Sequence, residues 1–499
     1  MGGAWERLLP RLTEIRDLSC ALALLSWDQH VMMPARGAPA RARTMATIES
    51  LLHERVAAPE VGELLSELEQ TPPEDEARVA SVTVLRRDHE RAIKVPEDLV
   101  RAIAEHQSRC FQSWTEARAA SDFDLLRADL ERMISLKKQE ADAIGHEGER
   151  YDALLDGFEP QMTTAEVETL FGDLVRGLKP LADAILDHAP ERPAFLSDHY
   201  EVDRQEAFCQ WLIETAGFDV SSGRLDRSPH PFTMHIGAGD VRQTTRYDPT
   251  DLLMSIRATM HETGHALYEQ GLPEDLYDLP VGRIRSLGLH ESQSRMWEIQ
   301  VGLSRPFADF MLPHLKDRFP AQLGNLSPDE FYAGINHPRR SMIRVISDEV
   351  TYNLHIALRF ELELALFRDE LEVADLRDAF GDGMERHVGI RPESDAQGVL
   401  QDMHWAIGGL GYFPTYTLGT LYAAAFYARA LEDLGDVSHD LRRGDVGRLL
   451  EWLRTNIHST GSKAPGKEIA QRVLGTGLTV DPFLEHLRTK YGELYGPLA

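Results

Sequence analysis

The stretch that organises the chain is Met260–Gly271, which reads MHETGHALYEQG and contains the pattern His-Glu-x-x-His. In a helix, His261 and His265 would lie one turn apart on the same face. Both imidazoles could then bind one metal ion, and Glu262 would lie close enough to act on a water bound to that ion. The stretch therefore predicts a metal-binding helix.

Signals on both sides of this motif favour a helix. Residues 248–251, Asp-Pro-Thr-Asp, supply capping side chains and an early proline, apolar residues recur at helical spacing from Leu252 to Met260, and Gly271 precedes Leu-Pro. The chain contains 20 histidines, so a chance match to the motif is a real alternative. In that case the two histidines would simply lie on an ordinary helix surface.

A catalytic zinc ion needs a third protein ligand and an open position. Glu269 would lie about 12 Å along the axis from the first histidine, which is too far. Glu291 and Glu298 share one face of an expected second helix, and we favour Glu291 as the ligand. We expect Glu298 to pair with Arg295, and His290 to contact either a metal ligand or the substrate.

Composition limits the classes of function. The net charge of −28 over 499 residues argues against a nucleic-acid-binding surface. The three cysteines, Cys20, Cys110 and Cys209, are too few for an all-cysteine metal site, and because they are far apart and form no CxxC, a disulfide framework is unexpected. No signal peptide and no membrane-spanning run is evident, so we expect a cytoplasmic protein without a membrane partner.

Most of the chain has helical periodicity, and Thr163 with Glu166 forms a capping-box pattern. We expect one large, mainly α domain over residues 1–499, with a deep active-site groove and residues 1–150 as a possible helical lid. A β-hairpin is expected at 232–247, beside the metal helix; its edge could either pair with a peptide or be an ordinary surface. Further helical stripes are at 11–25, 99–120, 122–143, 341–370 and 445–457.

Five stretches in order resemble the carboxypeptidase Taq family of metallocarboxypeptidases. They are His230–Phe232 (HPF), Asp240–Thr244 (DVRQT), His261–His265 (HETGH), His290–Ser294 (HESQS) and Ile343–Glu349 (IRVISDE); Trp27-Asp28 and Gly411–Tyr416 extend the likeness.

The resemblance implies that His261, His265 and Glu291 are the metal ligands and that Glu262 is the catalytic acid/base. It also implies a helical fold with a deep groove, a homodimer, and release of single residues from peptide C-termini. Thr263 replaces a usual alanine at a position that contributes no ligand. Ile346-Ser347 replace a more frequent Glu-Ala, and this second departure puts the substrate preference, but not the reaction, in doubt.

A developing oxyanion needs a hydrogen-bond donor besides the metal, and our candidates are Tyr412 and His404. The alternative is that both are packing residues. A ligand histidine usually donates its second ring N–H to an acceptor, for which we consider Asp348 or Glu349. In the reaction expected, Glu262 takes the proton of the attacking water and delivers it to the leaving amine.

A C-terminal exopeptidase must recognise a free carboxylate, which the planar fork of arginine suits. Arg344 is the first candidate and Arg242 the second, with His230 as a further substrate-binding residue. The alternative for each arginine is an internal ion pair, Arg344 with Asp348 and Arg242 with Asp240.

Three functions remain open. The first is a zinc-dependent carboxypeptidase acting on peptides with a free C-terminus, with cobalt or manganese as possible substitutes for zinc. The second is a metallo-oligopeptidase that uses the same residues as an endopeptidase, without a carboxylate clamp. The third is a non-catalytic peptide-binding protein with a vestigial site, against which the intact set of motif residues argues.

Overall fold

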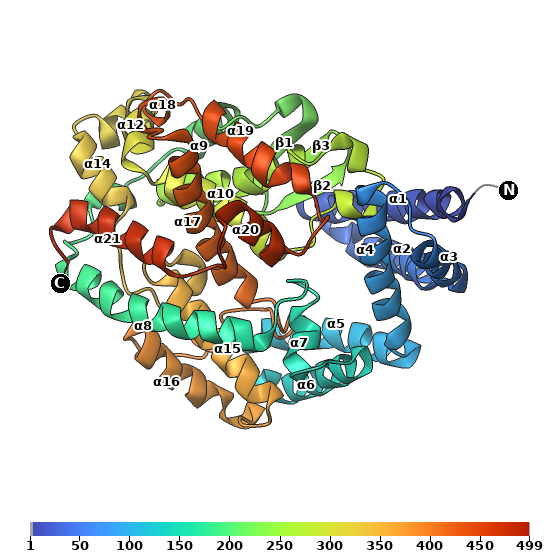
Figure 1. Cartoon of the computed structure of the whole chain (residues 1–499). Coiled ribbons are helices and arrows are strands. Elements are labelled where there is room, and N and C mark those ends of the chain that lie inside the picture. The colour runs from blue at the N-terminus through green and yellow to red at the C-terminus, as the bar shows by residue number, and fades with distance from the viewer. Residues whose placement is uncertain (1–2, 499) are drawn as a thin grey trace.

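The computed structural model describes residues 3–498 as one mainly helical body, as predicted (Figure 1). The first nine helices are α1 (Ala4–Val31), α2 (Ala38–Ala57), α3 (Pro59–Gln70), α4 (Glu76–Lys94), α5 (Glu97–Ala120), α6 (Asp124–Ile144), α7 (Arg150–Leu155), α8 (Thr164–His188) and α9 (Val202–Thr215). The central helices are α10 (Leu252–Gln270), α11 (Leu287–Arg295), α12 (Arg305–Arg318), α13 (Pro320–Leu323), α14 (Pro328–Ile335), α15 (Tyr352–Phe367) and α16 (Leu376–Val388). The last are α17 (Pro414–Leu434), α18 (Ser438–Leu441), α19 (Gly447–Asn456), α20 (Gly466–Leu474) and α21 (Asp481–Tyr495).

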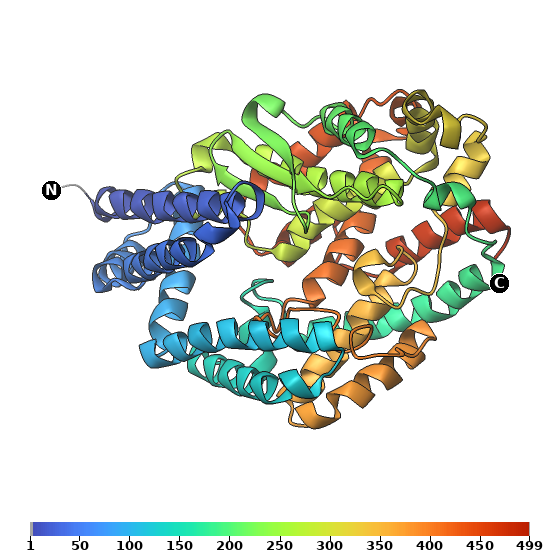
Figure 2. The same ribbon diagram turned by 180° about the vertical axis from the view of Figure 1, so that it is seen from behind.

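The N-terminal helices α1 to α4 lie together at one side of the molecule, next to the sheet (Figures 1 and 2). Helices α1, α3 and α4 share a small hydrophobic cluster that is separate from the main core and includes Trp5, Leu8, Leu65 and Leu85. Side chains of α5 and α6 belong to the main core instead. The segment with its own hydrophobic cluster is therefore shorter than the possible lid of residues 1–150. The role of these helices as a lid stays a prediction.

The strands form a sheet beside α10, in the order β1-β3-β2. Strands β2 (Thr233–Gly237) and β3 (Asp240–Thr245) are antiparallel, which confirms the predicted hairpin. Strand β1 (Gly223–Arg227) pairs in parallel with β3 and was not predicted. Its five residues, GRLDR, contain a single apolar side chain, so the alternation that signals a strand is missing.

Three helices meet at the centre of the fold, where α11 packs against both α10 and α17. Glycines allow the close approach. A Cβ at Gly264 of α10 would lie 2.4 Å from the carbonyl oxygen of Gln293, and a Cβ at Gly419 of α17 would lie 2.4 Å from Cγ of Glu291. The backbones therefore come together where the motif residues lie.

The helix predicted at 341–370 is wrong in its first third, because α15 begins only at Tyr352. Residues before it form a loop with a short 3₁₀ turn at Arg344–Ile346. The Asp348 carboxylate accepts hydrogen bonds from the backbone N–H groups of Val350 and Thr351, at 2.9 and 3.0 Å. Such local bonds compete with helix formation, which explains the late start.

The predicted capping box and three of the predicted helical stripes are confirmed. Thr163 and Glu166 form the expected capping box at the start of α8, and the stripes at 99–120, 122–143 and 445–457 correspond to α5, α6 and α19. The three cysteines are unpaired. None of the described helices is both long and apolar enough to cross a membrane.

Candidate metal centre

The structure brings together the three side chains that the sequence suggested as metal ligands. Nε2 of His261 and Nε2 of His265 lie 3.6 and 3.5 Å from the same oxygen of Glu291. One ligand atom from each residue lies within 4.8 Å of the others. Ligands about 2.0–2.2 Å from a tetrahedral zinc ion are themselves about 3.4 Å apart, so these residues fit a divalent ion.

The helices explain why these residues converge. The Asp251 carboxylate caps α10 by accepting a hydrogen bond from the backbone N–H of Met254 at 3.0 Å. Spacing by four residues then places the two imidazoles on one face of α10, with their centroids 5.0 Å apart. Helix α11 runs alongside and supplies Glu291. Glu269, one turn beyond His265, is directed elsewhere, as expected.

The protonation of the two histidines differs. Burial lowers the pKa of His265 to about 3, which keeps this ring in the neutral form that binds metals. Burial also opposes charge on His261, but Glu291 and Glu298 outweigh it and raise the pKa of His261 to about 9. A metal ion bound at His261 must therefore displace a proton.

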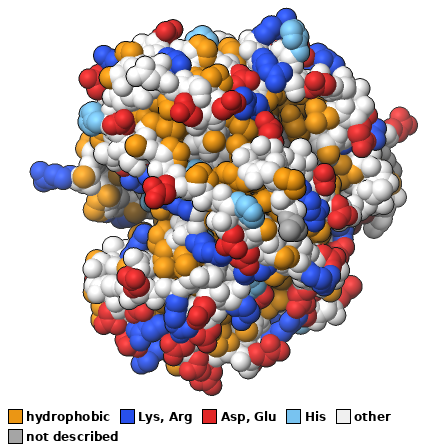
Figure 3. Space-filling model, turned by 90° about the vertical axis from the view of Figure 1, so that its left-hand side faces the viewer, with side chains coloured by type: hydrophobic (Ala, Val, Ile, Leu, Met, Phe, Trp, Pro, Cys, Tyr) orange, Lys and Arg blue, Asp and Glu red, His pale blue; other side chains and the backbone are white. Residues whose placement is uncertain are grey.

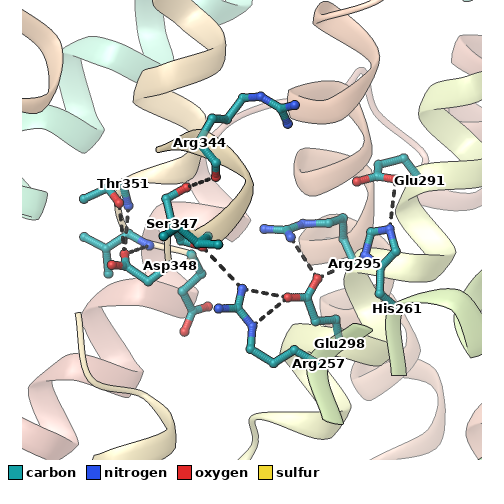
Figure 4. A network of polar contacts seen from close by, with 12 residues as sticks. Arg257, His261, Glu291, Arg295, Glu298, Arg344, Ser347, Asp348 and Thr351 are labelled. Carbon is teal, nitrogen blue, oxygen red and sulfur yellow. Dashed lines mark hydrogen bonds and ion pairs between the residues drawn. The ribbon is translucent and has the colours of Figure 1, made fainter. Parts of the chain in front are cut away.

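Glu298 holds the ring of His261 from behind (Figure 4). Nδ1 of His261 lies 3.1 Å from a carboxylate oxygen of Glu298, which leaves Nε2 facing Glu291. Glu298 also accepts hydrogen bonds from Arg295 at 2.8 Å, as predicted, and from Arg257 at 2.7 Å. Burial opposes charge on Glu298, but the two guanidinium groups hold its pKa well below the usual value.

The prediction that Asp348 or Glu349 orients a ligand histidine is therefore wrong. Glu349 is buried and pairs with His486 at 2.8 Å and with Lys490 at 2.5 Å, both on α21. Asp348 accepts backbone N–H groups at the start of α15. Their position close to Arg344 in sequence gave no information on distances to α10.

The Glu262 carboxylate is held by the neighbouring strand. The hydroxyl of Thr233 on β2 donates to Oε2 of Glu262 at 2.7 Å and lies 3.0 Å from the Glu262 backbone carbonyl. Burial raises the pKa of Glu262, against the opposing effects of His261 and Thr233. A raised pKa lies closer to the pH at which an enzyme works, and a carboxylate with such a pKa exchanges protons most effectively.

A second imidazole lies next to the candidate ligands. The ring of His290 stacks on that of His265, with centroids 4.0 Å apart, and its Nε2 lies 3.5 Å from Glu269. His235 of β2 contacts the other oxygen of Glu269 at 2.7 Å. His290 is thus a neighbour of a candidate ligand, one of the two contacts expected for it.

The segment before α17 carries the two candidate oxyanion donors. Nε2 of His404 lies 3.2 Å from the hydroxyl of Tyr416, and the rings of His404 and Tyr412 are 5.5 Å apart. Burial, and then the charge of Glu291, raise the pKa of Tyr412 to about 12, so its hydroxyl stays protonated. Tyr416 was missed by the sequence reasoning, although it ends the Gly411–Tyr416 motif.

A buried carboxylate, Glu363 of α15, fixes this segment. It accepts hydrogen bonds from Nε1 of Trp405 at 2.8 Å, from the backbone N–H of Gly411 at 3.0 Å and from the hydroxyl of Tyr151 at 2.6 Å. Two of these donors directly follow His404 or precede Tyr412 in sequence. Glu363 was also missed, since a glutamate in a helical stripe has no distinctive signal.

Arg344 is buried in an internal ion pair, but with a different partner from the one considered as its alternative role. Its Nη2 lies 2.7 Å from Asp402, and its Nη1 donates to the hydroxyl of Tyr352 at 3.1 Å. The expected pair with Asp348 is not formed, because that carboxylate is used by backbone N–H groups. Only the Nη1 edge of Arg344 is left for a ligand.

Arg242 forms the ion pair with Asp240 that was considered as its alternative, at 2.7 Å. Its guanidinium also lies 4.2 Å from the centroid of the Trp27 ring. His230 is exposed, and its backbone carbonyl accepts a hydrogen bond from the Ser228 hydroxyl at 2.6 Å. The structure thus joins Arg242 to the N-terminal helices rather than to the two ligand histidines.

Comparison of the sequence and the structure with known proteins identifies the family of this chain. The family described as carboxypeptidase Taq (M32) metallopeptidase matches residues 7–491. The chain belongs to this family. It is 43% identical to thermostable carboxypeptidase 1 of Thermus thermophilus, over 99% of both chains, and 37% identical to that of Pyrococcus furiosus, over 97% of this chain and 98% of the other. The crystal structure of an M32 carboxypeptidase from Deinococcus radiodurans matches with a TM-score of 0.96 at 38% identity, over 99% of both chains.

Membership confirms the resemblance noted from the five motifs. This M32 chain is a metallocarboxypeptidase, an enzyme that uses a divalent metal ion and acts on peptides. The interpretation as a non-catalytic peptide-binding protein is set aside.

Proposed function

We propose that this enzyme releases single amino acids from the C-termini of peptides, with one zinc ion held by His261, His265 and Glu291. The convergence of these three side chains, beside the buried carboxylate of Glu262, is the observation that carries the proposal. When bound, zinc would act as a Lewis acid that polarises the scissile carbonyl and lowers the pKa of water. Cobalt or manganese would fit the same donor set.

Glu262 is the proton carrier in this proposal. Its carboxylate takes a proton from the attacking water and delivers it to the leaving amine. Thr233 supports the role, because its hydroxyl fixes one oxygen of Glu262 and leaves the other free. The raised pKa of Glu262 favours uptake of the proton.

Tyr412 and His404 are proposed to donate hydrogen bonds to the carbonyl oxygen as it becomes negative. Each such donor typically contributes a factor of about 10²–10³ in rate. Burial supports this role for Tyr412, whose high pKa keeps the hydroxyl protonated. For His404, burial lowers the pKa to about 4, so it would donate as a neutral ring.

The substrate carboxylate is proposed to meet Arg344, with Arg242 as the second choice and His230 as a further contact. Asp402 occupies two nitrogens of the Arg344 guanidinium, while Nη1 and the Tyr352 hydroxyl lie together at 3.1 Å. These two groups could donate jointly to one carboxylate. A deep groove leading to them remains part of the proposal.

A homodimer and a cytoplasmic location are also kept as proposals. On the face shown in Figure 3, acidic and basic side chains are interspersed over the described surface. That pattern, with the net charge of −28, gives no support for a nucleic-acid partner. Sedimentation velocity would test the dimer.

An assay with two peptides that differ only at the C-terminus distinguishes an exopeptidase from an oligopeptidase. The metal-loaded enzyme should shorten a peptide with a free carboxylate one residue at a time, and should leave the C-terminally amidated peptide intact. Mass spectrometry of the products gives the answer. Internal cleavage of the amidated peptide would instead establish the endopeptidase alternative.

The catalytic step is tested with Glu262→Gln. This variant should bind metal as the native enzyme does, and hydrolysis should be abolished, because the amide cannot take up the proton. Glu361→Gln, which changes a surface partner of Arg386, is the matched control and should keep full activity. An active Glu262→Gln enzyme would disprove the role.

A further inference from the structure

Arg16 is a buried cation without a counter-ion among the described residues. It lies in α1, is 5% exposed, and forms no ion pair or side-chain hydrogen bond in that part of the chain. Its Nε is buried without a hydrogen-bond partner. The central carbon of the guanidinium lies over the ring of Tyr277, 3.8 Å from the centroid. Arginine cannot shed its proton, so an uncompensated charge in this position is costly.

A second arginine close by also lacks a carboxylate. Arg283 donates to the hydroxyl of Ser19 at 3.1 Å, and no acidic side chain of the described chain lies within ion-pair distance. Burial, then the charges of Arg16 and Arg285, lower the pKa of Arg283 to about 10. Arg285 itself is neutralised by Asp88 at 2.6 Å. The place therefore has an excess of positive charge in a strongly acidic protein.

A cavity of about 400 Å³ lies at this place, between α1, α2 and α4 on one side and residues 278–285 on the other. Arg283 lines it, and so do Leu12 and Ser19 of α1. These two residues are four before and three after Arg16, so Arg16 belongs to the same face of the helix, although it is not itself part of the cavity wall. Most of the remaining wall is apolar, with Ile15, Leu52, Val56, Leu85, Leu279, Pro280 and Ile284. The other charged residues of the wall are Asp278, which is exposed, and the ion pair of Asp88 with Arg285.

The cavity is distinct from the metal centre. Tyr277 and Glu269 lie between the cavity and the metal centre. The ring of Tyr277 is 6.1 Å from that of His235, and His235 contacts Glu269. The cavity does, however, border the segment that leads into α11, the helix that carries Glu291. A ligand here would join the separate N-terminal cluster to that segment.

We propose that this cavity binds a small organic carboxylate with an aliphatic body, at Arg16 and Arg283. Guanidinium groups bind carboxylates in a planar, charge-assisted manner, which would supply the missing counter-ion. The apolar wall would receive the aliphatic part, and the volume lies within the range of small-molecule sites. Inorganic phosphate would satisfy the charges but leave the apolar wall unused.

The test uses the metal-loaded, full-length enzyme and isothermal titration calorimetry. The probe is 4-methylpentanoate, compared with its neutral amide and with inorganic phosphate. Arg16→Gln and Arg283→Gln remove the proposed contacts. Arg86→Gln is the matched control, because Arg86 lies on α4 but pairs with Glu69 on the outer surface.

Binding of the carboxylate to native enzyme, weakened by about tenfold or more in each of the two variants and unchanged in the control, is the expected result. The amide should not bind. Equal affinity in native enzyme and both variants, equal binding of the amide, binding of phosphate alone, or no binding at all would overturn the proposal.

A crystal structure with the probe covers the case in which neither variant folds. A carboxylate within hydrogen-bond distance of Arg16 or Arg283 would support the proposal. A cavity without the probe at saturating concentration would overturn it.

Discussion

Glu298 and His261 are joined by a hydrogen bond in which Nδ1 of the imidazole lies 3.1 Å from a carboxylate oxygen. The same carboxylate is fixed by Arg257 and Arg295, and Arg257 lies 3.4 Å from the backbone carbonyl of Ser347 (Figure 4). One candidate ligand is thereby oriented by side chains from two parts of the chain, and the backbone of a third part, at Ser347, accepts a further hydrogen bond from Arg257. Glu298 thus has the position of an acceptor that fixes the tautomer of a metal-binding imidazole.

We predict that Glu298→Gln weakens metal binding about 10–100-fold, the usual effect of removing such an acceptor. The amide can still accept from Nδ1, but the charge that matches Arg257 and Arg295 is lost. Competition with a chelator of known affinity measures the effect. Glu361→Gln should leave the affinity unchanged, and an unchanged affinity in Glu298→Gln would contradict the role.

Gly264→Ala should reduce both stability and metal affinity. The added Cβ would meet the backbone of α11, at 2.4 Å from the carbonyl oxygen of Gln293, and would force α10 and α11 apart. Overpacking of this kind costs about 1–3 kcal/mol. Urea unfolding of the metal-free protein and a metal titration measure the two effects.

Gly172→Ala is the control for that experiment, because a Cβ in the middle of α8 meets nothing within 4 Å. It should stabilise the protein by about 0.5–1 kcal/mol through helix propensity alone. If Gly264→Ala behaved in the same way, the close approach of the two helices would be refuted.

Tyr412→Phe should lower kcat by about 10²–10³-fold and leave metal affinity unchanged, because only the proposed hydrogen bond to the developing oxyanion is lost. Steady-state kinetics with one C-terminal peptide is the measurement. The matched control is Tyr427→Phe, a partly buried tyrosine of α17. A full kcat in Tyr412→Phe would assign this side chain to packing.

Glu159 gives a prediction for the pH dependence of stability. Its side chain is fully buried and lies against the first turn of α11, where it accepts hydrogen bonds from the Ser286 hydroxyl and the backbone N–H of Gly288. Burial dominates and raises the pKa of Glu159 to about 7. The stability it contributes is therefore complete below its unfolded pKa of about 4.3 and is lost as the pH rises through about 7.

Replacing this group with a neutral amide removes the titration. The free energy of unfolding of the native enzyme, relative to Glu159→Gln, should fall by an amount on the order of 3 kcal/mol between pH 4 and pH 8 or so. Urea unfolding at several pH values measures the difference. A difference that is constant with pH would contradict the raised pKa.

The local parts of the fold and the site could be predicted because their signals are local. A four-residue spacing determines that His261 and His265 share a helix face, and alternation within a few residues determines the hairpin of β2 and β3. The capping box at Thr163 was found for the same reason. Glu291 was favoured from its place on the following helix, and the resemblance to the family then pointed to the same residue.

The contacts that the sequence did not predict join residues far apart in the chain. Asp402 pairs with Arg344 from 58 positions away, and Glu298 reaches His261 across 37 positions. For Arg344 the partner considered was Asp348, four positions away, and for a ligand histidine the acceptors considered were Asp348 and Glu349, for which the sequence offered no distance to α10. The distances in these pairs depend on how α10, α11 and the segment before α17 pack together. No periodicity in the sequence encodes that packing.

The central claim is that His261, His265 and Glu291 hold one divalent ion. Anomalous diffraction from crystals of the zinc-loaded enzyme tests it most directly. We predict a single strong peak about 2.0–2.2 Å from Nε2 of each histidine and from a carboxylate oxygen of Glu291. A zinc peak elsewhere, or one at the two histidines with Glu291 out of reach, would contradict it.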